Sequence, residues 1–322
     1  MKIITIEDVR DIYLKSVQRG IKFIFTKFSL SEKSRTKSSF NDNNKDGSNW
    51  WQIPYVIKRW NYLITGSKDV GYEEYISEKY SEGKKIKMLS MGSGVCSHEI
   101  EFARLNPDWE ITCLDFSEKL LQTAERIAIN EGLTNIKFLI SDIYKHTLPI
   151  DYYDIVLFHS SLHHFKNLDI FLEKIHNSLI PKGKLIINEY VGVNRLQYNK
   201  MQMREINQCL NLIDKKYKRM YKSNLYKNKY YGSGILRMII SDPSECIESE
   251  EILPNIYKKF RIVEEKGYGG NLLMPVLKNI SHHFIELDEE KKKLLVKIFD
   301  YEDKYLENNR SDFVFGIYER EK

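Results

Sequence analysis

The chain has no run of about 18 consecutive apolar residues, the minimum length of a membrane-spanning helix. The apolar stretch nearest the N-terminus, residues 21–28, is interrupted by Lys22 and Lys27, and no small-residue cleavage site follows it. These absences argue against a secretory leader and against a membrane partner. We therefore expect a soluble, cytoplasmic protein.

Cysteine is scarce, with four among 322 residues: Cys96, Cys113, Cys209 and Cys246. No pair has the CxxC or Cys/His spacing of a metal site, which favours a reduced compartment and no metal. The net charge of +5 is small for this length and does not by itself indicate a nucleic-acid or membrane partner. The chain also has no internal repeat.

Residues 87–96 are the most informative segment that is present. A short apolar strand ending at Met91 leads into a turn with Gly92 and Gly94, and a helix is expected from about Ser97. Gly92 lets the chain reverse where a Cβ would clash, and Gly94 lets a ligand lie against bare main chain. The following helix N-terminus offers N–H groups to an anion. This pattern is typical of a nucleotide-binding turn.

Short apolar runs alternate with amphipathic helices after residue 85, which predicts a doubly wound α/β domain with a parallel sheet. We expect strands near residues 86–91, 110–115, 136–141, 153–159 and 184–190, and helices near 97–105, 117–131 and 167–179. Later strands are expected at 260–265 and 313–320 as sheet edges, flanking helices near 276–284 and 287–308.

The sequence before residue 85 has helical periodicity at 5–29, 50–64 and 71–80, interrupted by a Ser/Lys/Asn-rich linker or flap at 31–48. This block is either a lid over an acceptor or simple helix packing against the sheet. We predict four regions: an N-terminal helical lid (1–84), a cofactor-binding core (85–192), a helical acceptor cap (193–257) and a C-terminal completion of the sheet (258–322).

The segment Leu89-Ser-Met-Gly-Ser-Gly-Val-Cys resembles the first motif of class I S-adenosyl-L-methionine (SAM)-dependent methyltransferases, Leu-Asp-Leu-Gly-Cys-Gly-Thr-Gly. Later landmarks follow the order of that family over residues 85–192 and, more loosely, in the final strand. The flanking segments resemble a less characterised bacterial biosynthetic branch. The resemblance implies a Rossmann-like, seven-stranded, mostly parallel sheet and SAM as cofactor. Ser90 departs from the usual acid, and Cys96 replaces the third glycine, so the acid's role in orienting the ligand ammonium could pass to Glu99 or to main-chain carbonyls.

Acidic residues end the next two strands. Asp115 lies 21 residues after Gly94, the spacing at which a carboxylate accepts hydrogen bonds from two ribose hydroxyls. Its alternative role is a solvated helix cap made with Ser117. Asp142 is placed to accept from an adenine amino group, or is a helix cap alone. The expected cofactor-binding residues are Met91, Gly92, Ser93, Gly94, Asp115, Phe116 on the adenine face, Asp142, Ile143 through its N–H, and His159 at the methionine end.

The fourth strand is followed by a cluster of histidines. Imidazole titrates near neutral pH and can take a proton from an acceptor hydroxyl, so His163 and His164 are candidate catalytic bases. Glu189 and Tyr190, which close the fifth strand, are rival catalytic candidates. A structural role is the alternative for the histidines, since the family often has Leu-His-His there. A metal is disfavoured because adjacent histidines on a loop point in different directions.

The sequence lacks the Asn/Asp-Pro-Pro-Tyr/Phe and Pro-Cys motifs of nucleobase methylation after the fourth strand. Basic and aromatic residues do interleave over 215–231, which suits RNA, a solvated cap, or an anionic small molecule or peptide. We predict a biosynthetic methyltransferase of a small molecule or peptide, with O-methylation ahead of N-methylation. The alternatives are an RNA methyltransferase, an NAD-dependent oxidoreductase and a catalytically silent SAM-binding protein.

Overall fold

A mostly parallel, seven-stranded sheet forms the centre of the computed structural model, which describes residues 2–19, 48–81 and 83–321. Its strand order is β3-β2-β1-β4-β5-β7-β6. The strands are β1 (Lys87–Met91), β2 (Glu110–Asp115), β3 (Ile136–Ile140), β4 (Tyr153–His159), β5 (Leu179–Tyr190), β6 (Phe260–Gly269) and β7 (Phe313–Arg320). β1 pairs in parallel with both β2 and β4, so the order reverses between β1 and β4. The predicted doubly wound α/β class is confirmed.

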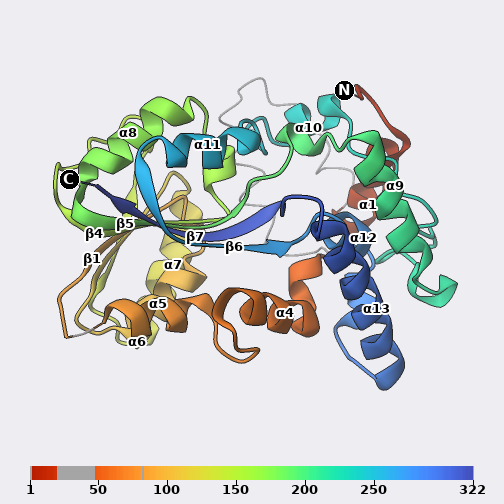
Figure 1. Ribbon diagram of the computed structural model, residues 1–322, viewed down its shortest axis with the longest axis horizontal. Coiled ribbons are helices and arrows are strands. Elements are labelled where there is room, and N and C mark those ends of the chain that lie inside the picture. The colour runs from red at the N-terminus through yellow and green to blue at the C-terminus, as the bar shows by residue number, and fades with distance from the viewer. Residues whose placement is uncertain (1, 20–47, 82, 322) are drawn as a thin grey trace. The chain divides into compact units, whose positions relative to one another are not determined.

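Helices cover both faces of this sheet (Figure 1), with α8 and α11 on one face and α5, α6 and α7 on the other. Apolar side chains from the strands, among them Leu89, Val156 and Phe158, form a buried core with Phe171 and Ile175 of α8. Strands that are buried on both faces have almost continuous apolar sequences, and for this reason the short runs after residue 85 predicted them well.

The other elements span the following residues. The α-helices are α1 (Ile6–Arg19), α4 (Pro54–Thr65), α5 (Tyr72–Tyr80), α6 (Ser97–Leu105), α7 (Glu118–Asn130), α8 (Leu168–Ser178), α9 (Lys200–Asn211), α10 (Ile235–Ser241), α11 (Ile252–Tyr257), α12 (Leu273–Leu277) and α13 (Glu289–Leu306). The 3₁₀ turns are η1 (Trp50–Gln52), η2 (Leu162–His164), η3 (Asn194–Leu196), η4 (Lys215–Tyr217), η5 (Ser249–Glu251) and η6 (Ser281–Phe284).

The chain divides into two compact units. The first, unit 1, comprises Met1–Leu63, Gly192–Cys246 and Gly267–Phe313. The second, unit 2, comprises Ile64–Val191, Ile247–Lys266 and Val314–Lys322 and contains most of the sheet. The four predicted regions stay a prediction.

Unit 1 has its own apolar core, built around Trp50. The Trp50 ring is buried and meets Trp60 edge-on at 4.6 Å between centroids and Phe313 at 5.2 Å. Nearby, the buried carboxylate of Glu302 accepts hydrogen bonds from the backbone N–H groups of Leu272 and Leu273, at 2.9 and 3.0 Å. These bonds satisfy donors that would otherwise be orphaned where α12 begins.

Two expected helices are broken in the structure. The helix expected at 276–284 is instead α12 followed by the separate turn η6, because Asn279 has a left-handed backbone, with φ of +69°, and its N–H donates to the carbonyl of Ser48. The helix expected at 50–64 is a 3₁₀ turn followed by α4, which begins at Pro54. Proline favours the first helical position and holds the preceding residue, Ile53, in extended backbone.

Strand positions also differ in part from expectation. β7 lies between β5 and β6 and is not an edge strand, which agrees with the burial of Val314 through Tyr318. β5 begins at Leu179, five residues before the predicted start. Of the first predicted helix, residues 20–29 lie outside the described residues, as does most of the 31–48 linker. Within the part of the chain described, no helix is long and apolar enough to cross a membrane.

Candidate functional site

The glycine turn after β1 has the predicted conformation. Gly92 and Gly94 have φ of +70° and +57°, and Cys96 also has a positive φ, +55°. A Cβ on Gly92 would lie 2.8 Å from the Cβ of Ser161, so a side chain there would force the neighbouring loop to move. Cys96 occupies a left-handed position that glycine adopts more easily, and the turn forms despite this strain. α6 then begins at Ser97, as predicted.

Asp115 ties this turn to the end of β2. Its Oδ2 accepts a hydrogen bond from the N–H of Gly94 at 2.9 Å, and its Oδ1 accepts one from the N–H of Ser117 at 2.7 Å. Only 1% of Asp115 is exposed, and burial raises the pKa of its carboxyl, against the lowering effect of the backbone N–H groups. The alternative of a solvated cap is therefore wrong, although a bond to Ser117 does form.

The space beside Gly94 fits a ligand laid against main chain. A Cβ built on Gly94 would have no atom within 4 Å, whereas the one on Gly92 would clash. The Asp115 carboxylate accepts backbone hydrogen bonds from Gly94, Ser117 and Phe116, and a carboxylate has about four lone-pair sites. Asp115 can therefore still accept hydroxyl hydrogens, which is the chemistry that a ribose requires.

A buried acid stands next to Ser90, the position where the family motif has its acid. Ser90 Oγ donates to Glu99 Oε1 at 2.5 Å, and Glu99 comes from the first turn of α6. Glu99 Oε2 is buried and has no hydrogen-bond partner among the described residues. Burial raises the pKa of Glu99, and the charge of His98 and the bond from Ser90 oppose that rise. The acid that the family motif has on the first strand is thus replaced by Glu99 on α6, whose Oε2 accepts no hydrogen bond from the described residues.

The other predicted cofactor residues follow the strand ends as expected. Met91 ends β1, Ser93 lies within the turn, and Phe116 follows Asp115 and is partly buried. Asp142 Oδ1 accepts from the N–H of Tyr144 at 3.2 Å, which is the capping contact weighed from the sequence. Ile143 is buried, and its carbonyl accepts from Lys174 Nζ at 3.0 Å. Their contacts with a ligand stay predictions.

The predicted catalytic residues are joined through Glu189, which is fully buried. Its Oε2 accepts from the N–H groups of Ser161 and Leu162, and its Oε1 lies 2.5 Å from His163 Nδ1. The ring of His164 lies against that of His163, with 4.2 Å between centroids and 39° between the planes. Glu189 therefore holds the loop after β4 in place, a positioning role that leaves its own oxygens occupied. Tyr190 is 3% exposed.

His159, at the end of β4, belongs to a cluster that the sequence did not reveal. Tyr72 Oη lies 2.9 Å from His159 Nδ1, and the two rings are stacked. The ring of His98 lies 3.6 Å from that of His159, centroid to centroid, and His98 Nδ1 is bonded to Glu73. Tyr72 and Glu73 lie on α5 and His98 on α6. Of the three other residues in this cluster, His98 alone could have been expected from the sequence, because it closely follows the glycine turn.

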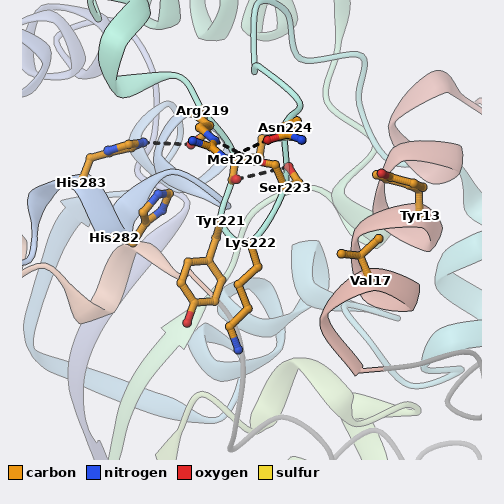
Figure 2. Close-up of a pocket in the computed structure, with 10 residues that line it drawn as sticks. All are labelled: Tyr13, Val17, Arg219, Met220, Tyr221, Lys222, Ser223, Asn224, His282 and His283. Atoms are coloured by element: carbon orange, nitrogen blue, oxygen red, sulfur yellow. Dashed lines mark hydrogen bonds between the residues drawn. The ribbon is translucent and has the colours of Figure 1, made fainter.

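The basic and aromatic segment 215–231 belongs to unit 1, where some of its side chains are buried and others are exposed. Lys227 Nζ donates to the carbonyls of Pro275, Val276 and Lys278, and Tyr230 is buried. Part of the segment faces a hollow of about 510 Å³ (Figure 2). The hollow is lined by Tyr13, Val17, Arg219, Met220, Tyr221, Lys222, Ser223, Asn224, His282 and His283. Arg219 is already bonded there to Ser223 and Asn224.

A comparison with known proteins finds relatives of the segment that contains the glycine turn and most of the strands. Residues 82–270 match a family model described as "Methyltransferase domain". Malonyl-[acyl-carrier protein] O-methyltransferase of Bacillus cytotoxicus is 24% identical over 115 residues, 36% of this chain and 39% of that protein. The enzyme of the same name from Bacillus cereus is 25% identical over 115 residues, 36% of this chain and 41% of that protein. The chain therefore aligns with about two fifths of the length of these relatives.

Among solved structures, phosphoethanolamine N-methyltransferase 2 of Haemonchus contortus, in complex with S-adenosyl-L-methionine, superposes with a TM-score of 0.52. It is 14% identical, and the match covers 92% of this chain and 61% of that one. At this identity the likeness shows the fold alone. It agrees with the seven-stranded sheet described above.

Proposed function

The chain belongs to the methyltransferase-domain family, and from that premise we propose that it methylates an oxygen atom of a small molecule or peptide in a biosynthetic pathway. It is an enzyme, and its cofactor is S-adenosyl-L-methionine. SAM supplies a methyl group already activated on a positively charged sulfonium. What this chain must provide is therefore mainly a seat for the cofactor, a position for the acceptor and exclusion of water.

The residues at the carboxyl edge of the sheet fit that cofactor. We assign the ribose hydroxyls to Asp115, the bare main chain beside the ligand to Gly94, and the adenine to Asp142, Ile143 and Phe116. The ammonium group of the methionine end is assigned to Glu99. The observation that carries this last assignment is the unpartnered, buried Oε2 of Glu99 next to Ser90. A buried carboxylate oxygen without a partner is costly, and a cation would satisfy it.

The preference for oxygen draws support from the two curated relatives, which are named as O-methyltransferases of malonyl-[acyl-carrier protein]. We propose that the methylated oxygen belongs to a hydroxyl or a carboxyl group. His163 and Glu189 are bonded to one another, so we give that pair the role of holding the loop after β4.

The other candidates have less support than O-methylation. An oxidoreductase does not agree with the family match over residues 82–270. An RNA methyltransferase rested on basic and aromatic side chains over 215–231. Two of these rings, Tyr217 and Tyr230, are buried and cannot stack on bases, whereas Tyr226 is 42% exposed. Lys216 is paired with Glu290, 2.5 Å away.

The test uses the whole chain with methyl-deuterated SAM and separate pools of small molecules, peptides, malonyl-acyl-carrier protein and the RNA fraction of a host extract, analysed by mass spectrometry. We expect the label on an oxygen atom in one pool. Asp115→Asn should lose S-adenosylhomocysteine binding and transfer together, while Asp108→Asn, on the exposed surface of the same unit, should keep both. Label on nitrogen, or label in the RNA fraction of a host extract, would refute the proposal.

A further inference from the structure

We propose that Tyr72, His98 and His159, with Glu73 behind them, form an array that accepts the proton of a hydroxyl acceptor during methyl transfer. This inference deepens the proposed function and rests on it. It gives His159 a catalytic role in place of the cofactor contact expected from the sequence, with Tyr72, Glu73 and His98 as positioning residues. It also narrows the acceptor from a hydroxyl or carboxyl group to a hydroxyl group.

The array lies beside the glycine turn. His159 is the last residue of β4, and β4 pairs in parallel with β1, which ends at Met91 just before Gly92. His98 is the second residue of α6, which begins directly after the turn. In doubly wound sheets, ligands bind at the carboxyl edge where the strand order reverses, which here is between β1 and β4. His159 is therefore at the edge of the sheet where cofactor and acceptor must meet.

The contacts of His159 fix its ring. Tyr72 stacks on it at 5.5 Å between centroids with 12° between the planes, and the hydroxyl of Tyr72 lies 2.9 Å from Nδ1. His98 covers it from α6 at 3.6 Å between centroids. With hydrogen on Nδ1, His159 donates to Tyr72 Oη, and its Nε2 presents a lone pair. A hydrogen bond to one ring nitrogen is what sets the role of the other.

Burial and the neighbouring charges shift the pKa values of His159 and His98 in opposite directions. Burial, and then the nearby His98, lower the pKa of His159 well below its ordinary value. Burial also acts to lower the pKa of His98, but the hydrogen bond and charge of Glu73, together with Glu99, outweigh it and the net shift is upward. Among the described residues, the titratable groups that act on these two histidines are Tyr72 and Glu73 of α5 and Glu99 of α6. His159 is therefore neutral at pH 7, and a base of such low pKa takes the proton only as the methyl bond forms and makes the hydroxyl strongly acidic.

The proton balance of the step identifies the acceptor. The acceptor oxygen forms its bond to the methyl carbon, and the carbon–sulfur bond breaks with its electron pair staying on sulfur. The hydroxyl proton passes to Nε2 of His159, which then releases it to water. One positive charge is lost at sulfur as one appears on the imidazole, so the buried site never carries an extra charge. A carboxylate has no proton to give and would not need this array.

The experiment compares the wild-type chain with His159→Asn, Tyr72→Phe and a control, His176→Asn, which changes a histidine on α8 away from the array. S-adenosylhomocysteine binding is measured by calorimetry, and transfer to the labelled acceptor by mass spectrometry. We expect His159→Asn to lower kcat about 100-fold or more, the range of general-base catalysis, with S-adenosylhomocysteine affinity kept within about twofold. His176→Asn should change neither.

A second measurement follows the protonation of His159 and needs no methyl acceptor. Nuclear magnetic resonance of ¹⁵N-histidine-labelled protein should show that His159 stays neutral through pH 6.5, and that Tyr72→Phe moves its Nδ1 shift. A His159 that titrates near pH 6.5 would overturn the inference, and so would a kcat for His159→Asn within about fivefold of wild type.

The outcomes also separate the two proposals. A methyl ester as the wild-type product would keep O-methylation and overturn the array. A nitrogen-methylated product, or none, would overturn the proposed function, and the titration of His159 would then decide the array by itself.

Discussion

Replacing Gly94 with alanine tests the cofactor seat, because the new methyl group would stand where we place the ligand. Gly94 has φ of +57°, and a Cβ there meets nothing within 4 Å. The left-handed backbone costs an alanine about 1–2 kcal/mol of folding free energy, partly offset by the lower entropy of the unfolded chain. We expect a loss of about 1 kcal/mol in urea unfolding.

Binding should suffer more than folding. Forcing one methyl group into close-packed surroundings costs about 1–3 kcal/mol, and 1.4 kcal/mol is a factor of ten. Gly94→Ala should therefore weaken S-adenosylhomocysteine about 5- to 150-fold in isothermal calorimetry.

Gly132→Ala is the matched control. Gly132 follows α7 with φ of +71° and has the same open space around its missing Cβ, but it lies far along the chain from the turn. It should lose the same stability and keep wild-type affinity. Equal affinities for the two variants would refute the assignment of the ligand to the space beside Gly94.

Three further predictions concern buried acids. Glu99→Gln keeps the shape of the side chain but removes its charge, so S-adenosylhomocysteine should bind about 10- to 150-fold more weakly by calorimetry. The affinity for 5′-methylthioadenosine, which lacks the ammonium group, should stay at the wild-type value. Equal losses of affinity for the two ligands would contradict the assignment of the ammonium group to Glu99. Glu189→Ala leaves two buried N–H groups and a histidine without their partner and should lower the free energy of unfolding in urea by about 3–5 kcal/mol, and a loss under about 1 kcal/mol would argue against its holding role. For Asp11, burial acts to raise the pKa, but Lys278 and Arg237 outweigh it and lower the pKa below its ordinary value, so its contribution is full above about pH 5 and is lost as the pH falls. Asp11→Asn should thus flatten the fall of stability in urea titrations from pH 5 to pH 3, and an unchanged slope would contradict the ion pairs.

The sequence predicted the turn and most of the sheet because both depend on local chemistry. Gly92 and Gly94 are needed where the backbone has positive φ, and strands such as 153–159 are apolar because both of their faces are buried. The position of Asp115 could be predicted for the same reason, since it ends a strand at a fixed spacing from the turn.

Side chains brought together by tertiary packing could not be predicted in this way. Tyr72 and His159 are 87 positions apart, and nothing in either segment indicates that α5 brings its tyrosine to the end of β4. The continuous helix expected at 276–284 fails for a related reason. Its break at Asn279 depends on a hydrogen bond to Ser48, more than 200 residues earlier in the chain.

The bonds from Gly94 and Ser117 to Asp115 have a consequence for turnover. They hold the turn in shape before any nucleoside arrives, so binding need not order this loop, a process that costs about 1–2 kcal/mol per residue. On our assignment this rigid turn contacts the adenosine and amino-acid parts of the cofactor, and those parts are the same in SAM and in S-adenosylhomocysteine. We therefore expect strong product inhibition, with the rate in a cell governed by how quickly the spent nucleoside is removed.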